Sequence, residues 1–418
     1  MQARTRAVKA AGATALAGWL AVTAAGCSQS PDNVRAADTD PGGDGVLKVG
    51  LLLESTGEQK FLNEAQRAAA RLAVQDINDA GGYEGSPVQL LPTQAGEAAA
   101  IAARDFINSG ADVVIGPTDS SSAPAAIDLL SDASTALISP ANSAAALSRY
   151  PSDGYYFRTF PSRVLEGRAL AQQVRRASPG SVAVLHGGSA YATTVTEALQ
   201  DGLATRGISS KRIPLAEGRA QAVQEAEAAD AVVLVAREQA REALRWLVET
   251  GVDPAAVFLG SGATAAFGGD FADGALGGVH GVLAGGVPDN EFQGRLLKLA
   301  PDLGHMTFAA EAYDAVVLAA LAAADAGDDA GSSIAAHLQE VSGHHQDSPQ
   351  GEPCGSYSRC LEILGQGMTI DYRGESGPVT FNNDGDIITA EFRFYEYGVG
   401  NLPRIGGTIR ASLPAEPG

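Results

Sequence analysis

The chain has 418 residues, with 29 Lys and Arg against 49 Asp and Glu, which gives a formal net charge of −20. Nucleic-acid binding is set aside, because it depends on basic side chains that neutralise phosphates. A hydrophobic fraction of 45% with only 6% aromatic residues favours a folded α/β protein of two or more domains over a disordered chain or an aromatic-rich β-sandwich.

Residues 1–26 have the features of a bacterial lipoprotein signal peptide. Three basic residues precede an apolar run over 10–25, which is shorter than the roughly 20 residues of a membrane-spanning helix. The run ends at Ala24-Ala25-Gly26-Cys27, which resembles a lipobox with Ala24 in place of the usual Leu. We expect lipidation of Cys27; the alternative is ordinary secretory cleavage with an incidental cysteine. The polar, Pro- and Gly-rich residues 27–45 are expected to form a flexible tether.

Folded structure is predicted from residue 46 onward. Short apolar runs predict strands over 46–53, 88–91, 111–116 and 136–139, and helical spacing predicts helices over 61–79, 95–109 and about 123–132. This alternation indicates a parallel sheet with helices on both faces.

The same alternation begins again after Pro161. Helices are predicted over 164–176, 193–206, 239–250, 290–299 and 308–326, and strands over 181–186, 231–236, 256–260 and 279–283. The segments 378–381 and 387–397 flank Asn383-Asp384-Gly385, which predicts a β-hairpin. We therefore expect an α/β fold of two Rossmann-like lobes joined by a hinge, with ligand binding in a cleft beyond the carboxyl ends of the strands.

Two more cysteines, Cys354 and Cys360, are separated by five residues. In an exported chain such a pair favours a local disulfide. A redox or metal role is disfavoured, since there is no Cys-x-x-Cys and no His at ligand spacing.

Signals for catalysis are absent from the sequence. There is no Gly-x-Ser-x-Gly, no phosphate-binding loop and no dinucleotide-binding glycine motif. His186-Gly187-Gly188-Ser189 is interpreted as a strand-to-helix turn, His344-His345 as a solvated loop, and Asn382 to Asp386 as a hairpin turn and not a calcium loop. The chain is expected to be no enzyme and to have no cofactor and no metal site.

Small polar residues follow two neighbouring strands of the first predicted sheet. Pro117 to Ser122 comes after the strand over 111–116, and Ser139 to Ser143 comes after the next strand. Serine hydroxyls and free backbone N–H groups at a helix N-terminus suit a carboxylate, so these loops are candidates for one ligand site. The alternative for Ser121 and Ser122 is simple capping of the helix.

At this point the sequence resembles the leucine/isoleucine/valine-binding branch of the type I periplasmic binding proteins, the substrate-binding subunits of ABC importers. The resemblance covers about Val46 to Gly407. It rests on an ordered set of segments: Leu51 to Gly57 with Phe61-Leu62, Val74 to Asn78 before Gly81-Gly82, Val113 to Gly116, Ser120 to Ser122, Ile138 to Asn142, and Tyr155 to Thr159.

The resemblance implies a set of ligand-binding residues. Ser120, Ala141 and Ser143 correspond by position to the residues that hold the ligand's carboxylate and ammonium. Phe61 and Tyr191 match aromatic positions of the family, although Tyr191 as a core or lid residue stays an alternative. Ser121 and Asp119 complete the expected site.

The sequence departs from the family pattern in the second lobe. The family's acidic partner for the ammonium lies in a loop that here reads Gly260 to Thr264 and contains no carboxylate, and Ala236-Arg237 occupies the place of a second aromatic. Because an unpaired buried ammonium is costly, an aliphatic amino acid is not a secure ligand. Asp119 or Glu238 is a possible substitute, or the ligand is an amide or another small polar compound.

The resulting prediction is an extracytoplasmic lipoprotein on the outer face of the bacterial membrane. It would capture an amino acid or a related small polar compound and deliver it, as a monomer, to an ABC permease. The alternative is a receptor domain that senses a ligand and signals to a membrane partner. We expect the first lobe to comprise residues 46–161 and 286–376, and the second lobe residues 162–285 and 377–410.

Overall fold

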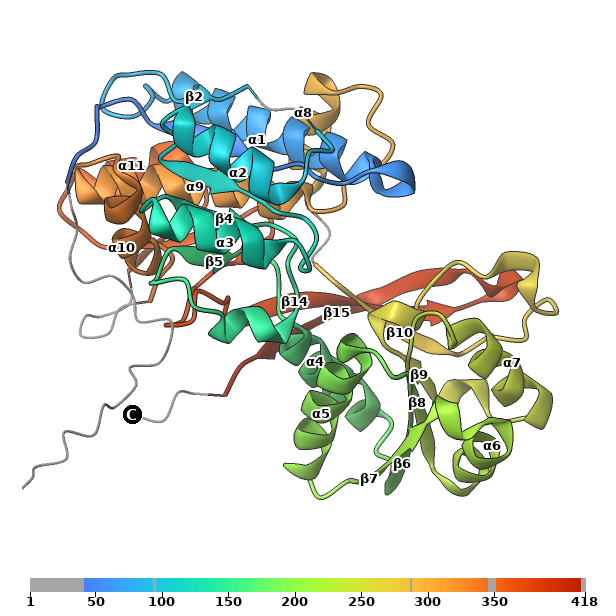
Figure 1. Cartoon of the computed structure of the whole chain (residues 1–418). Coiled ribbons are helices and arrows are strands. Elements are labelled where there is room, and N and C mark those ends of the chain that lie inside the picture. The colour runs from blue at the N-terminus through green and yellow to red at the C-terminus, as the bar shows by residue number, and fades with distance from the viewer. Residues whose placement is uncertain (1–40, 93–94, 286–287, 345–350, 415–418) are drawn as a thin grey trace, which may run out of the picture. The chain divides into compact units, whose positions relative to one another are not determined.

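The first sheet has five parallel strands in the order β2-β1-β3-β4-β5. Figure 1 labels β2, β4 and β5 of this sheet. The computed structural model describes residues 41–92, 95–285, 288–344 and 351–414, so Cys27 and His345 lie outside the described residues. The strands are β1 (Lys48–Leu51), β2 (Gln89–Leu90), β3 (Val113–Ile115), β4 (Ala136–Ser139) and β5 (Tyr156–Arg158). All are short, and all except the edge strand β2 are mostly buried, as expected for a sheet covered on both faces.

Helices cover both faces of this sheet because alternate strand residues point to opposite sides. Val113 and Ile115 pack in a core with α1 (Phe61–Asp79) and α9 (Ala309–Ala326), whereas Val114 packs with α2 (Ala99–Asn108) and α3 (Ala123–Asp132). Helix α9 is buried along residues 309–323, which explains its nearly unbroken apolar sequence. The same core includes residues of α8 (Asn290–Leu299), α10 (Gly331–Val341) and α11 (Tyr357–Leu364).

The second sheet has seven strands in the order β15-β14-β10-β9-β8-β6-β7. Five are parallel: β6 (Ser181–His186), β7 (Ser209–Pro214), β8 (Ala231–Val235), β9 (Val257–Leu259) and β10 (His280–Ala284). One face packs on α4 (Arg163–Arg176) and α5 (Ala190–Ala204), and the other on α6 (Arg219–Ala228) and α7 (Ala240–Thr250). Both sheets thus confirm the predicted α/β class.

A small third sheet contains β11 (Glu352–Cys354), β12 (Ile370–Gly374) and β13 (Gly377–Pro378). The predicted Cys354–Cys360 disulfide is confirmed here, and it joins β11 to α11 with 5.3 Å between the Cα atoms. Both cysteines are buried in the first core.

The predicted hairpin at the end of the chain is wrong in its pairing. The turn at Asn382 to Gly385 brings only Phe381 and Ile387 into a single antiparallel bridge. Strand β14 (Thr389–Tyr397) instead pairs antiparallel with β10 and with β15 (Pro403–Ser412), a strand whose glycines and polar residues concealed it. The longer partner provides more backbone hydrogen bonds, while Pro378 pairs with β12.

Five predicted elements have their expected bounds, namely α1, α3, β4, β6 and α8. Polar or alanine-rich segments were missed: β7 has only Ile213 buried, and α6 buries only Ala222 and Ala226. No helix in the described part of the chain combines the length and apolar character needed to span a bilayer. The lobe boundaries stay a prediction.

Candidate ligand-binding site

Two adjoining pockets are lined by loops that follow strands of both sheets. One has a volume of about 470 Å³ and the other about 450 Å³, and both are lined by Ala141, Ser143, Arg163 and Phe308. The first also includes Ser120 after β3, Tyr191 after β6 and Arg237 after β8. In parallel sheets, ligands bind at the loops that follow the carboxyl ends of the strands, so this is the position expected for a ligand site.

The first-sheet side of the pockets is built by two loops that bind each other. Ser120 Oγ accepts hydrogen bonds from the backbone N–H groups of Ser143 (3.1 Å) and Ala144 (3.3 Å). Ser139 Oγ accepts a hydrogen bond from Asn142 N (3.0 Å) and donates one to Pro117 O (2.7 Å). These bonds also connect the loop after β4 to the loop after β3. The Ser143 side chain is 5% exposed, and its hydroxyl has no hydrogen bond to any described residue.

Two of the backbone N–H groups after β3 are not free, because carboxylates accept their hydrogen bonds. Glu54 Oε1 accepts from Asp119 N (2.6 Å), and Asp119 Oδ1 accepts from Ser121 N (2.8 Å). The capping alternative is not realised either, since the Ser122 hydroxyl donates to Asp119 O and makes no cap hydrogen bond to α3. This loop therefore presents a serine hydroxyl and an acidic side chain to the pocket.

On the second-sheet side, Tyr191 is held by a buried hydrogen-bond network. Its hydroxyl donates to Glu166 Oε1 (2.9 Å) and accepts from Gly262 N (2.8 Å). Glu166 Oε1 also accepts from Ser261 N (2.8 Å), and its other oxygen pairs with Arg163 (3.0 Å). Burial is the main cause that raises the pKa of the Tyr191 hydroxyl, followed by the charge of Glu166.

The ring of Tyr191 lies between two guanidinium groups. The Arg163 and Arg237 guanidinium carbons are 4.8 Å and 4.7 Å from the ring centroid, within the range of cation–π attraction. Glycine is required beside them: a Cβ on Gly262 would lie 2.7 Å from Arg237 Cγ and from Tyr191 Cε1. The loop after β9 thus replaces the acidic side chain of the family pattern by backbone that supports an aromatic–arginine stack.

A buried acid and a further arginine line the second pocket. Glu311 belongs to α9 and Arg393 to β14. Burial raises the pKa of Glu311 to about 7, and the charge of Asp314 adds to this while Arg393 opposes it. Arg393 donates to the carbonyl oxygens of Gly285 (3.1 Å) and Ala284 (3.4 Å), so it is held by backbone.

Most of the predicted site residues come together. Ser120, Ala141, Ser143, Asp119 and Tyr191 line the first pocket, whereas Phe61 and Ser121 are not among the residues that line either one. Phe61 instead packs against the ring of His305. Sequence reasoning missed Arg163, Glu166, Glu311 and Arg393; only Arg237, placed directly after a buried strand, carried a readable signal.

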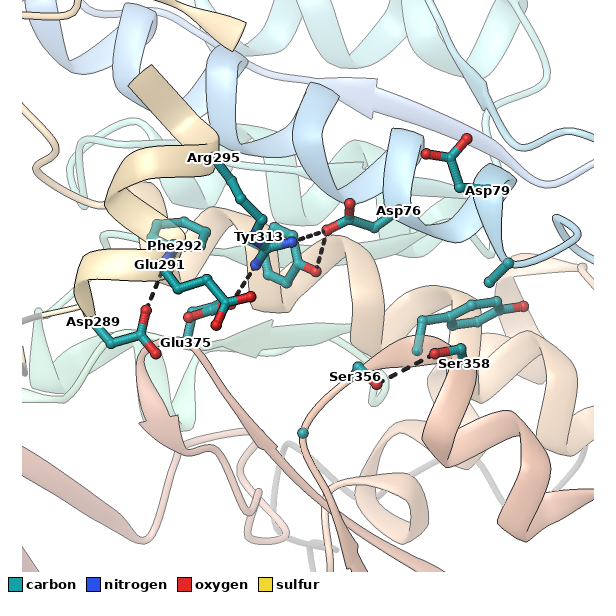
Figure 2. A pocket seen from close by; sticks show the side chains of 13 residues that line it. Asp76, Asp79, Asp289, Glu291, Phe292, Arg295, Tyr313, Ser356, Ser358 and Glu375 are labelled. Atoms are coloured by element: carbon teal, nitrogen blue, oxygen red, sulfur yellow. Dashed lines mark hydrogen bonds and ion pairs between the residues drawn. The ribbon is translucent and has the colours of Figure 1, made fainter. Parts of the chain in front are cut away.

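A further pocket of about 500 Å³ is lined by acidic residues and one arginine (Figure 2). Arg295 pairs with Asp76 (2.5 Å) and Glu375 (2.7 Å), and the Tyr313 hydroxyl donates to Asp76 (2.7 Å). Burial and the charge of Asp314 raise the pKa of Glu375 to about 7, although Arg295 opposes the shift. These ion pairs join α1, α8 and the segment before β13, which is a structural role.

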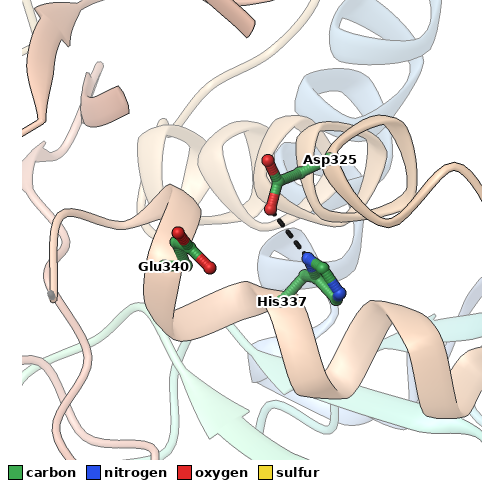
Figure 3. A group of neighbouring side chains, drawn as sticks. All are labelled: Asp325, His337 and Glu340. Atoms are coloured by element: carbon green, nitrogen blue, oxygen red, sulfur yellow. Dashed lines mark hydrogen bonds and ion pairs between the residues drawn. The ribbon is translucent and has the colours of Figure 1, made fainter. Parts of the chain in front are cut away.

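Three metal-ligand side chains meet elsewhere among the described residues, at Asp325, His337 and Glu340 (Figure 3). His337 Nδ1 and Asp325 Oδ2 are 2.7 Å apart, and this hydrogen bond raises the pKa of the imidazole. The ion pair is one of the contacts between α9 and α10, which also pack against each other in the first core. The motif His186 to Ser189 is the predicted strand-to-helix turn, because Ser189 caps α5 through Ala192 N.

Comparison with known proteins identifies relatives of this chain. A family model described as periplasmic binding protein matches residues 46–358. The leucine-, isoleucine-, valine-, threonine- and alanine-binding protein of Pseudomonas aeruginosa is 29% identical over 180 residues. That alignment covers 40% of this chain and 44% of the relative, so this chain matches less than half the relative's length.

Two solved structures share the fold across most of both chains. A branched-chain amino acid substrate-binding protein of Streptococcus pneumoniae, in complex with isoleucine, has a TM-score of 0.58 and 19% identity, and the match covers 88% of this chain and 100% of that one. A solute-binding protein of R. palustris, in complex with benzoate, has a TM-score of 0.57 and 19% identity over 89% and 98%. At this identity the likeness shows the fold alone.

Proposed function

Because the chain belongs to the periplasmic binding protein family, we propose that it is the extracytoplasmic substrate-binding protein of an ABC importer. It would capture a small polar ligand, an amino acid or a related compound, and deliver it to a membrane permease. The observation that carries this proposal is the pocket of about 470 Å³, which combines Ser120 and Ser143 from one sheet with Tyr191 and Arg237 from the other.

Ligand capture in this proposal depends on contacts from both sheets. Ser143 is 5% exposed and lines the pocket, and its hydroxyl makes no hydrogen bond to a described residue, so a ligand oxygen would complete its hydrogen bonding. A ligand that touches residues of both lobes favours the closed state over the open one, because only the closed state makes both sets of contacts. The lobes would divide at 46–161 with 286–376 and at 162–285 with 377–410.

The proposal includes a lipid anchor at Cys27, supported by the apolar run over 10–25 and the small residues before the cysteine. Two acyl signals suffice to hold a protein at a membrane surface. In this arrangement the polar residues 28–45 would tether the folded part near the permease.

Native mass spectrometry of gently purified protein tests the binding function. We expect a bound small molecule whose release on unfolding leaves the mass of the polypeptide alone. After the molecule has been removed, adding it back should raise the melting temperature, since a ligand that binds only the folded state stabilises it. Protein that carries no small molecule, and that no cell-extract metabolite stabilises, would refute the proposed function.

A further inference from the structure

The candidate ligand site is rich in arginine, although the chain as a whole is strongly acidic. The formal net charge of the chain is −20. The basic and acidic residues that line the two pockets are three arginines (Arg163, Arg237 and Arg393) and two acids (Asp119 and Glu311). Arginines therefore outnumber acids on the pocket walls by one, and they offer cationic partners to a negatively charged group of a ligand.

The three arginines differ in what already neutralises them. Arg163 forms an ion pair with the buried Glu166, and Arg393 donates to two backbone carbonyl groups. Arg237 makes no ion pair with any residue that the structure describes, yet it lies 4.7 Å from the centroid of the Tyr191 ring. Arg237 is an exposed residue whose guanidinium lies over the Tyr191 ring at the pocket wall, so its charge stays available to a ligand.

Among the described residues that line the two pockets, none on the second-sheet side has a carboxylate for a ligand ammonium. Ser261 and Gly262 present backbone N–H groups, which donate to Glu166 Oε1 and the Tyr191 hydroxyl. Glu166 itself is buried and already accepts from Tyr191, Ser261 and Arg163. Glu238, the substitute considered from the sequence, does not line either pocket. An ammonium here would face two guanidinium groups.

We propose that the ligand is a small organic acid without an ammonium group, whose carboxylate pairs with Arg237 while Ser120 and Ser143 bind its remaining polar atoms. This inference rests on the proposed binding function and narrows its ligand class. A guanidinium offers two parallel N–H groups to one carboxylate, so it binds this group in a defined orientation. The ligand would then lie in the opposite orientation to that of the family pattern, in which the serine residues of the first lobe hold the ligand's carboxylate.

Matched ligand pairs that differ only by the amine provide the test. Calorimetry compares leucine with 4-methylpentanoate, phenylalanine with 3-phenylpropanoate, and glutamate with glutarate, each on protein freed of bound ligand. We expect the acid without an amine to bind about ten-fold or more tightly than its amino-acid partner in each pair that binds. Equal or tighter binding of the amino acid would overturn the proposal, and so would failure of all six compounds at millimolar concentration.

Variants of Arg237 separate charge from packing. Arg237→Gln should weaken the best-binding acid by about 10- to 100-fold, the range of a charge-assisted hydrogen bond. Arg176→Gln is the matched control, because Arg176 also lies over an aromatic ring, that of Phe394 at 5.1 Å, but lines neither pocket. Arg237→Glu should reverse the preference within each matched ligand pair, so that the amino acid binds more tightly than the acid without an amine. Unchanged acid binding in Arg237→Gln would contradict the proposed ion pair.

The outcomes distinguish this inference from the proposed function. One outcome is that leucine binds tightly, that Arg237→Gln leaves its affinity unchanged and that Asp119→Asn weakens it. In that case the protein is a binding protein that recognises an ammonium group, and the inference about the ligand class is wrong. If neither these compounds nor any metabolite from cell extract stabilises the protein, the binding function itself is wrong.

Discussion

Replacing Tyr191 by Phe tests whether the hydroxyl network beneath the pocket stabilises the second sheet. The substitution keeps the ring between Arg163 and Arg237 but removes the bonds to Glu166 Oε1 (2.9 Å) and from Gly262 N (2.8 Å). The side chain is 9% exposed, so water does not readily replace these bonds. A lost hydrogen bond to a charged group costs about 1.5–3 kcal/mol, and the unpaired N–H of the half-buried Gly262 adds about 1 kcal/mol, the lower end of the range for such a group.

We expect Tyr191→Phe to lower the free energy of unfolding by about 2–4 kcal/mol, since Glu166 keeps its bonds from Ser261 and Arg163. Urea unfolding followed by circular dichroism measures the change, and amide exchange should accelerate at Gly262. The matched control is Tyr150→Phe, whose hydroxyl donates to Asp128 over the same 2.9 Å but at an exposed site. The reasoning fails if the two variants unfold at the same urea concentration.

Three further predictions concern charge, pH and the anchor. Asp386→Asn should destabilise the protein by about 3–5 kcal/mol, because it leaves the charge of the fully buried Arg158 unpaired. The control is Glu391→Gln, which breaks the exposed ion pair of Glu391 with Arg410. Equal effects of the two variants in urea unfolding would contradict the argument. Burial raises the folded-state pKa of Glu311 to about 7, so stability should fall as pH rises from about 4.5 to 7. Glu311→Gln should reduce this fall by about 2–3 kcal/mol, and identical pH profiles of thermal unfolding would refute the raised pKa. Cys27→Ser should move the protein from the membrane fraction to the soluble fraction; fractionation like wild type would exclude the lipid anchor.

The fold was largely predictable because its core elements carry strong local patterns. Helix α1 has apolar residues at helical spacing and a glycine pair after it, and strands such as β6 are apolar runs between turns. Strands β7 and β15 were not predictable in this way. They have many polar or glycine residues, and their pairing is decided by neighbours far along the chain.

In the candidate site, too, residues with a local sequence signal were predictable and residues placed by tertiary packing were not. Ser120 and Ser143 were predictable because each follows a buried strand of one parallel sheet. Glu311 and Arg393 come from a helix and a strand about 80 residues apart and meet at the second pocket only through tertiary packing. The carboxylates of Glu54 and Asp119 accept hydrogen bonds from two of the N–H groups in this loop, those of Asp119 and Ser121, because local acidic side chains compete with a ligand for these donors.

The central claim is that the two adjoining pockets lined by Ser143 bind the ligand. Calorimetry of Ser143→Ala with the molecule found by native mass spectrometry tests this claim most directly. The Ser143 hydroxyl makes no hydrogen bond to a described residue, so its removal should change the stability of the empty protein little. Ser120 is less suitable, since its Oγ holds two backbone N–H groups of the loop. We predict about ten-fold weaker binding with an unchanged melting temperature of the empty protein. Affinity equal to that of wild type would contradict the account.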